Sequence, residues 1–506
     1  MTDTTRAGSA ASKALVLLAV CLAAVAMPLT FTGPAVALTA IARSLGGNPV
    51  ALNWVTNAFM LTFGSTLMGA GALSDSYGRK RVFLTGVAAF ALTSLALVGA
   101  RSILMFDLLR AAQGLAAAAA FAGGMAALAQ DFDGPARIRA FSIVGASFGT
   151  GLSFGPIASG LMSETFGWPS IFLLTVALTA LAFAIGLLTI RESRDPEAVG
   201  LDWPGAISFT LALTLFTYGV LQAPESGWND PLVISLLASS TALLALFGVI
   251  ETRVKRPMLD LSLFRYGRFV GVQLLAAAPA YAFVVLLILL PIRFVGIEGV
   301  SEIGAGRLMM ALSAPLLVLP LVAGWLTRWF SSAVICGTGL LISAVGLFWL
   351  SFVPAGGNPL ALLPPMVLIG IGISLPWGLM DGLAVSVVPS ERAGMATGIF
   401  STVRVAGEGV ALAVVSAVLS ALTASDLAGA HPREGAQKLV TGDVAGAASL
   451  LPDMTRAALV QAYGNGFSTL LMLLAGITVV TALVVFTFLG EGRVEKEVAA
   501  CVEEGA

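Results

Sequence analysis

Long apolar runs, separated by short polar segments, recur along the whole chain. Fourteen of these runs are about 20 residues long or longer, which is the length a helix needs to cross a bilayer. They lie near residues 14–41, 53–73, 82–100, 103–129, 138–161, 168–190, 204–223, 231–250, 268–295, 302–326, 332–353, 360–388, 396–424 and 466–489. The pattern predicts an all-α polytopic membrane protein.

The positive charges between the runs indicate an orientation. Placing the N-terminus inside puts roughly three times as many Lys and Arg residues in cytoplasmic loops as in outer loops. Because positively charged loops stay in the cytoplasm, we expect a multi-pass protein of the cytoplasmic (inner) membrane with both termini cytoplasmic.

Two charged linkers, residues 191–202 and 251–268, isolate one pair of spans from the rest. We therefore expect an N-terminal six-helix bundle over 14–190, a linker with two additional helices over 191–266, and a C-terminal six-helix bundle over 267–490. Both bundles begin inside, so they can be parallel repeats about an axis normal to the membrane. The extra pair is expected to be a spacer beside the bundle.

Composition narrows the function. The chain is 58% apolar and 11% charged, whereas soluble domains carry roughly a quarter charged residues. A net charge of −1 gives no reason to expect nucleic-acid binding. One His and three widely spaced Cys predict neither a metal site nor a disulfide framework. A polytopic enzyme would need a clustered nucleophile, His or metal ligands, so we expect a protein that is not an enzyme.

The stretch Gly71–Arg81 joins the second and third runs and is unusually charged for this chain. Asp75 ends one span, and Arg79 is the first of three cations that begin the next. Gly71 and Gly78 allow a tight turn and close helix approach. Asp75 and Arg79 can therefore form a breakable latch, although a positive-inside anchor beside a solvated Asp75 explains the same residues.

The fourth span carries Asp107, Arg110 and Gln113 in an otherwise apolar run. An arginine inside the bilayer is costly unless it faces a partner or water. Asp107 precedes Arg110 by three residues, so the two share a helix face. They form either a mutually neutralised structural pair or a cavity-lining pair that senses a proton or a charged substrate.

The fifth span has a stripe of small residues that includes Gly151, Gly155 and Gly160. Such stripes let two helices touch backbone to backbone. Pro156 removes one backbone hydrogen bond and is expected to bend the span. A bent, glycine-lined helix suits a rocking interface between two halves, but tight packing alone accounts for the glycines equally well.

These three motifs resemble signature sequences of the major facilitator superfamily. Loop 71–81 resembles the superfamily's loop between its second and third helices. Arg110 with Gln113 resembles its fourth-helix motif, and residues 151–160 resemble the fifth-helix motif associated with antiporters. Together with the fourteen spans, the chain is similar to the drug:proton antiporter family with fourteen helices. The resemblance implies a major-facilitator-type fold, two six-helix bundles plus two extra helices between them.

The chain also departs from that family's pattern. Thr30 stands where an acidic residue is expected in the first span, Ser159 stands where a glycine is usual, and Arg328 occupies the position equivalent to Asp75 in the second bundle. At the start of the second span, Trp54 and Asn57 resemble the family's aromatic entry segment. That resemblance implies a substrate contact, and an interfacial aromatic anchor is the alternative.

The second bundle supplies acids for proton coupling. Asp381 follows Trp377 by four residues and has no cation within one turn, which suits reversible protonation. Arg404 and Glu408 share one face of the thirteenth span. We rank the proton-coupling residues as Asp381, then Glu408, then Asp107, with Arg110, Gln113, Trp54, Asn57, Trp377 and Arg404 lining a cavity.

The resemblance and the buried charges together predict a proton-coupled efflux transporter that works by alternating access. It would export small amphipathic or cationic organic molecules, driven by the proton gradient and without a cofactor. Its partners would be the substrate, protons and the lipid bilayer, and the protein would be monomeric. The alternative is a proton-coupled symporter that imports a small metabolite on the same fold, which the fifth-span motif argues against.

Overall fold

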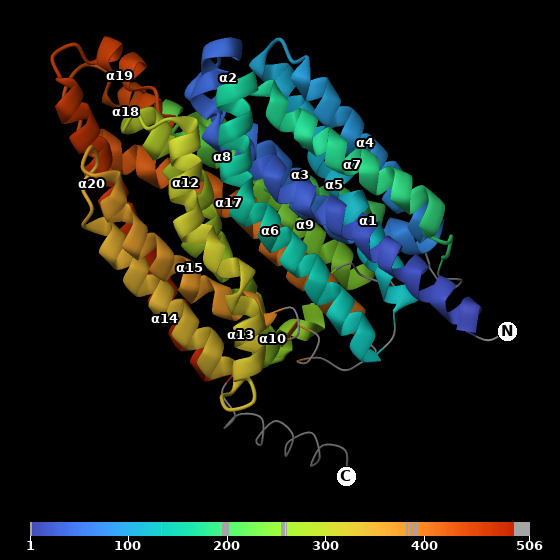
Figure 1. Cartoon of the computed structure of the whole chain (residues 1–506). Helices are drawn as coiled ribbons and strands as arrows, with labels where there is room; N and C mark the ends of the chain where they lie inside the picture. The colour runs from blue at the N-terminus through green and yellow to red at the C-terminus, as the bar shows by residue number, and fades with distance from the viewer. Residues whose placement is uncertain are drawn as a thin grey trace.

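Helices account for almost all of the described residues, and they run as long, roughly parallel rods (Figure 1). The structure is a computed structural model and describes residues 3–132, 134–194, 202–254, 259, 261–380, 383–384, 387 and 393–489. No strand occurs within these ranges. The predicted all-α polytopic fold is therefore confirmed, as expected where a bilayer forces every backbone polar group to be satisfied within its own segment.

The first part of the chain contains seven helices that pack on one another. Their bounds are α1 Asp3–Val36, α2 Leu38–Leu45, α3 Pro49–Tyr77, α4 Arg79–Val98, α5 Ile103–Asp131, α6 Gly134–Phe166 and α7 Pro169–Thr189. Helix α1 packs on α6 and α7, while α5 packs on α3 and α4. We call α1 and α3–α7 the N-terminal group. Residues at the helix ends determine where these helices begin. At the start of α3, the Asn48 side chain accepts a hydrogen bond from Ala51 N, and Pro49 is the first helical residue.

A second set of helices follows the two central ones. Its bounds are η1 Leu261–Arg265, α10 Gly267–Pro279, η2 Ala280–Val284, α11 Val285–Ile292, η3 Arg293–Ile297, α12 Glu302–Ser313, η4 Ala314–Leu317, α13 Leu319–Leu326, α14 Ser332–Ser351, η5 Pro359–Leu362, α15 Leu363–Trp377, α17 Ala393–Ser425, α18 Pro432–Val440, α19 Val444–Leu450 and α20 Arg456–Leu489. Helix α14 packs on α15 and α20, and α17 packs on α20 and α10. We call α10–α15, α17 and α20 the C-terminal group.

Prolines explain why two predicted spans are not regular α-helices along their whole length. The stretch Gly267–Ile297 is continuous but passes through two π-helical turns, η2 and η3, which follow Pro279 and Pro291. Because proline lacks an N–H, neighbouring backbone groups must pair differently, and wide turns are one solution. In the next span, the 3₁₀ turn η4 containing Pro315 separates α12 from α13.

Twelve helical segments within the described residues are long and apolar enough to cross a membrane. Helices α3 and α6 cover the predicted spans 53–73 and 138–161 but are not among the twelve. Both are long, at 29 and 33 residues, and both are rich in glycine, serine and threonine, which lowers their apolar character. The count of fourteen therefore stays a prediction.

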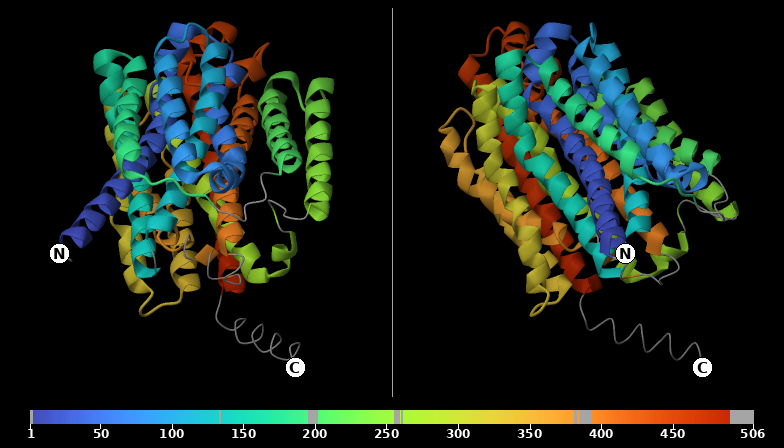
Figure 2. Two further views of the ribbon diagram at one scale, coloured as in Figure 1. Left: turned by 90° about the vertical axis from the view of Figure 1, so that its right-hand side faces the viewer. Right: turned by 45° about the vertical axis from the view of Figure 1, so that its right-hand side comes forward.

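Helices α8 (Trp203–Ser226) and α9 (Pro231–Arg253) pack on each other and stand at one edge of the molecule (Figure 2). Helix α8 also packs against α3 of the N-terminal group and α17 of the C-terminal group. Helix α8 thus covers the line along which α3 and α17 meet.

The two groups touch mainly along two seams, α3 against α17 and α6 against α12, and α1 also packs on α11. The first residues of α1 and the last of α20 lie at one end of the molecule, and α2, α18 and α19 lie at the other (Figures 1 and 2). We call these the terminal end and the cap end. The segment between α17 and α20 contains no predicted span, and the structure folds part of it into α18 and α19.

Candidate functional site

Arg110 is the centre of a buried polar network in the N-terminal group. The side chain is 0% exposed. Its Nε donates to the Val55 carbonyl oxygen at 2.8 Å, and its Nη1 donates to Gln113 Oε1 at 2.5 Å. Gln113 Nε2 in turn donates to Ser94 Oγ at 2.7 Å. The network therefore joins α5 to α3 and α4, and the guanidinium lies 4.6 Å from the centre of the Phe59 ring.

Three polar atoms beside this network have no hydrogen-bond partner among the described residues. They are Arg110 Nη2, Asp107 Oδ1 and Asn57 Oδ1, all of them buried. Asp107 and Arg110 form no ion pair within 4.0 Å, but they interact electrostatically. Buried polar atoms without partners are costly, and functional sites are where they commonly persist.

The predicted residues of the C-terminal group gather where the end of α15 lies near the middle of α17. The Arg404 guanidinium lies 5.5 Å from the Phe400 ring centre and 6.0 Å from that of Trp377. Trp377 also meets the edge of Phe283 at 6.2 Å. Glu408, one turn beyond Arg404, is 5% exposed and interacts electrostatically with it. The structure thus brings Trp377, Arg404 and Glu408 together, while Asp381 lies outside the described residues.

The α3–α17 seam brings the two polar clusters toward each other. Gly64 of α3 lies so close to α17 that an added Cβ would be 2.3 Å from Ala406 N. Gly409 of α17 faces α3, where the nearest atom to such a Cβ is Leu61 N at 3.2 Å. Glu408 therefore lies at the depth of Leu61, about one helical turn from Asn57.

The charged loop at the terminal end makes its contacts inside the N-terminal group. Arg79 Nη2 lies 3.2 Å from Asp75 Oδ1, and Arg79 Nη1 donates to Gln130 Oε1 at 3.3 Å. Glu192 accepts from Lys80 N at 3.2 Å and pairs with Arg81 at 3.4 Å. Nothing in the linker's sequence distinguished Glu192 from the other acids there.

The two glycines of this loop have different environments. Gly78 ends α3 with φ +112°, and an added Cβ would lie 2.5 Å from Glu192 Oε1. An added Cβ at Gly71 would meet nothing within 4 Å. The close helix approach expected at Gly71 is therefore not found, because none of the described helices reaches that face of α3.

The glycine stripe of α6 faces two different partners. Added Cβ atoms at Gly151 and Gly155 would lie 2.5 Å from Val25 O and from Thr32 Oγ1 of α1, within the same group. Gly160 instead faces α12, with Glu302 O at 2.4 Å. Pro156 touches α12 as well, beside Gly306, and α6 continues through it as one helix.

Two further features were not expected from the sequence. Trp54 meets the edge of Tyr218 on α8 at 6.2 Å. Arg293, near the end of the predicted span 268–295, is 1% exposed within η3. Its Nε lies 2.7 Å from Glu298 Oε1, and its Nη2 donates to the carbonyl oxygens of Val353 and Pro354. In the sequence, this ion pair could have been suspected only from the spacing of the two residues, since Glu298 follows Arg293 by five positions.

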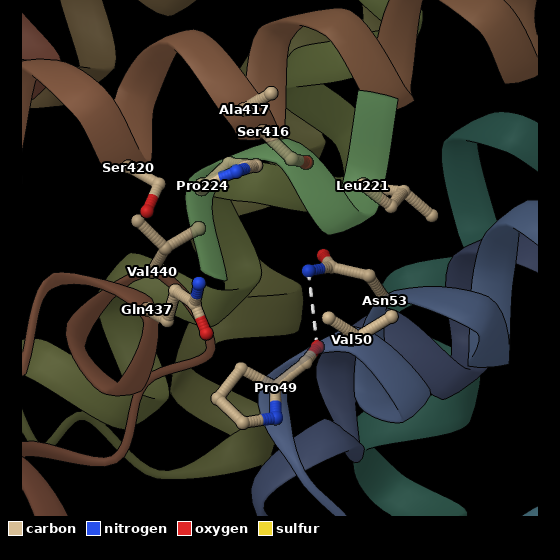
Figure 3. A pocket seen from close by; sticks show the side chains of 10 residues that line it. All are labelled: Pro49, Val50, Asn53, Leu221, Pro224, Ser416, Ala417, Ser420, Gln437 and Val440. Atoms are coloured by element: carbon tan, nitrogen blue, oxygen red, sulfur yellow. Dashed lines mark hydrogen bonds between the residues drawn. The ribbon is translucent and has the colours of Figure 1, made fainter. Parts of the chain in front are cut away.

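A small pocket opens at the cap end between α3, α8, α17 and α18 (Figure 3). Asn53, Ser416, Ser420 and Gln437 are its polar lining residues. Asn53 Nδ2 donates to Pro49 O at 3.0 Å, whereas Gln437 Nε2 is buried without a partner. None of the residues predicted as functional lines this pocket. Among the described residues, no group of three or more His, Cys, Asp or Glu side chains is placed to hold a metal ion.

Comparison with solved structures identifies the same overall fold. A bacterial homologue of the human lysosomal transporter Spinster, in an inward-facing and unoccupied conformation, superposes with a TM-score of 0.61 and 16% identity, covering 94% of this chain and 97% of that one. A structure described as giving insights into substrate recognition in proton dependent oligopeptide transporters has a TM-score of 0.60 and 14% identity, covering 94% and 99%. At these identities the similarity concerns the fold alone.

Sequence relatives are closer. The chain is 32% identical over 394 residues to the multidrug resistance protein Stp of Mycobacterium tuberculosis, covering 78% of this chain and 73% of Stp. It is 34% identical over 397 residues to the cephamycin export protein CmcT of Amycolatopsis lactamdurans, covering 76% and 80%. The family model for the Major Facilitator Superfamily matches residues 18–412. This chain therefore belongs to the Major Facilitator Superfamily.

Proposed function

We propose that this protein is a proton-coupled antiporter that exports small amphipathic or cationic organic molecules across the cytoplasmic membrane. The main support is that relatives covering three quarters or more of the chain are named as drug resistance and export proteins. Transport needs a route and a driving force rather than a catalytic centre or a cofactor. The protein would work as a monomer, with the terminal end in the cytoplasm and the cap end outside.

The coupling mechanism rests on acids near a seam between moving parts. Residues 14–190 and 267–490 would rock as two bundles, with α8 and α9 carried between them. Glu408 on α17 is buried at the depth where α17 meets α3. A carboxyl group there that binds either a proton or a cationic substrate would make the two exclude each other, and this competition would couple their fluxes.

The direct test is efflux driven by an imposed proton gradient in everted membrane vesicles, with fluorescent cationic dyes as substrates. Glu408→Gln and Asp381→Asn should each abolish gradient-driven accumulation while dye binding to purified protein is retained. Asp107→Asn should have a smaller effect, and Asp453→Asn provides an acid-to-amide control outside the predicted cluster. Accumulation driven by the gradient in both Glu408→Gln and Asp381→Asn would rule out these acids as coupling groups. Flow of dye in the same direction as protons would favour the symporter.

A further inference from the structure

The α6–α12 seam is joined at backbone distance over much of its length. Ser153 Oγ donates to Ser313 O at 2.6 Å, and Ser313 Oγ donates back to Ser153 O at 3.2 Å. Farther toward the cap end, an added Cβ at Gly306 would lie 2.6 Å from Ile157 Cα. An added Cβ at Gly160 would lie 2.4 Å from Glu302 O. Nothing can pass between α6 and α12 at this end while these contacts hold.

One charged contact closes the cap end of the seam. Glu164, in the last turn of α6, accepts a hydrogen bond from Ile303 N at 3.1 Å. Ile303 belongs to the first turn of α12, where backbone N–H groups have no partner within their own helix. The next N–H, from Gly304, is accepted by Ser301 Oγ at 3.1 Å. The start of α12 is therefore capped jointly, by its own Ser301 and by a carboxylate from the other group.

The charge of Glu164 suits this role, because a carboxylate is stabilised at a helix N-terminus. Two other charged groups act there. Glu302 of α12 is repelled by Glu164 and attracted by Arg43 of α2, and its carboxylate also interacts with the Ser163 hydroxyl of α6. Glu302 is fixed in α12 itself, so it moves with that helix. When α6 and α12 separate, Glu164 loses its hydrogen bond from Ile303 N, which caps the start of α12.

We propose that Glu164 is a gate residue that stabilises the closed state of the cap end by capping α12 across the seam. In the orientation given under the proposed function, that end is the outer one, and Glu164 would hold the transporter inward-facing. Opening to the outside would then break this hydrogen bond and leave Ile303 N and the Glu164 carboxylate to be satisfied by water alone. The residue is exposed at its rim position, so substituting it leaves the packed part of the seam intact.

The test measures the separation of α6 from the C-terminal group by pulsed electron spin resonance. Spin labels are placed at Phe166 and Leu360, which are 75% and 61% exposed, in a full-length variant with the three native cysteines replaced by serine. Glu164→Ala should raise the ratio of long to short separations by about five-fold, the change that loss of a helix cap of ~1 kcal/mol produces. Glu164→Gln keeps an acceptor oxygen and should shift the ratio less.

Thr165→Ala is the matched control, since the hydrogen bond of its side chain within the described residues goes to Leu161 O of its own helix. The proposal fails if Glu164→Ala leaves the distance distribution unchanged, or if Thr165→Ala shifts it equally. The distances need no substrate and no gradient. If Glu164→Ala shows the wild-type distance distribution, the result counts against the proposed gate but not against the antiporter. If the distances shift as expected but the wild-type protein exports no dye, the result counts against the antiporter but not against the gate.

Discussion

The Nε of Arg110 donates a 2.8 Å hydrogen bond to the carbonyl oxygen of Val55 and so fixes a fully buried cation of α5 to the backbone of α3. The partner is a neutral carbonyl rather than an acid. The buried cation is therefore held in place by hydrogen bonds, because the planar guanidinium can donate to Val55 and Gln113 at the same time.

Arg110→Lys should therefore impair the protein although it keeps the charge. A lysine cannot reproduce the forked contact, so Gln113 or Val55 loses a donor at a cost of ~1–3 kcal/mol. We expect a clearly lower melting temperature of the purified protein and at least a ten-fold loss of dye efflux. Arg101→Lys, at an exposed position, is the control. Wild-type melting and efflux in Arg110→Lys would contradict the importance of the fork.

Gly64→Ala should disturb the α3–α17 seam. Its Cβ would lie 2.3 Å from Ala406 N and 2.5 Å from Ala406 Cα, and backbone atoms cannot move aside as a flexible side chain can. We expect efflux to fall at least ten-fold at equal expression, because the two groups can no longer meet at this point. Gly407→Ala, on the same seam but with nothing within 4 Å of the added Cβ, should retain activity. Equal activity in the two variants would mean that this close approach is not needed.

Gly78→Ala should destabilise the charged loop. A residue with a side chain is strained at φ +112°, typically by ~1–3 kcal/mol, and its Cβ would also press on Glu192. Gly71→Ala has open space and should be neutral or slightly stabilising, because alanine favours a helix. Protease cleavage of the loop in inside-out vesicles should increase for Gly78→Ala only. Similar cleavage of both variants would argue against strain at Gly78.

The Arg293–Glu298 pair should contribute to stability rather than to transport. Both side chains are nearly fully buried, at 1% and 3% exposed. Arg293→Met leaves the Glu298 carboxylate unpaired, which typically costs ~3–5 kcal/mol. The double variant Arg293→Met with Glu298→Gln should recover much of that loss. Thermal unfolding measures both, and efflux per folded molecule should stay near the wild-type value. A double variant as unstable as Arg293→Met alone would contradict this account.

The sequence by itself determined the class of protein and the approximate ends of most helices. Hydrocarbon offers no hydrogen bonds to the backbone, so an apolar run of about 20 residues in a bilayer has to be helical. Signals local to the chain, such as Asn48 before Pro49 at the start of α3, fix where the helices begin. Arg110 and Gln113 were recognisable because polar side chains stand out in an apolar run.

Only the tertiary structure decided which of these residues meet. Arg110 reaches Val55, Glu192 reaches the loop at Lys80, and Glu164 reaches Ile303, and in each case the partner lies on another helix or linker far along the chain. Helical periodicity shows which face a residue occupies but not which helix will cover that face. The partner of a buried charge depends on how helices pack, and that is a property of the whole bundle.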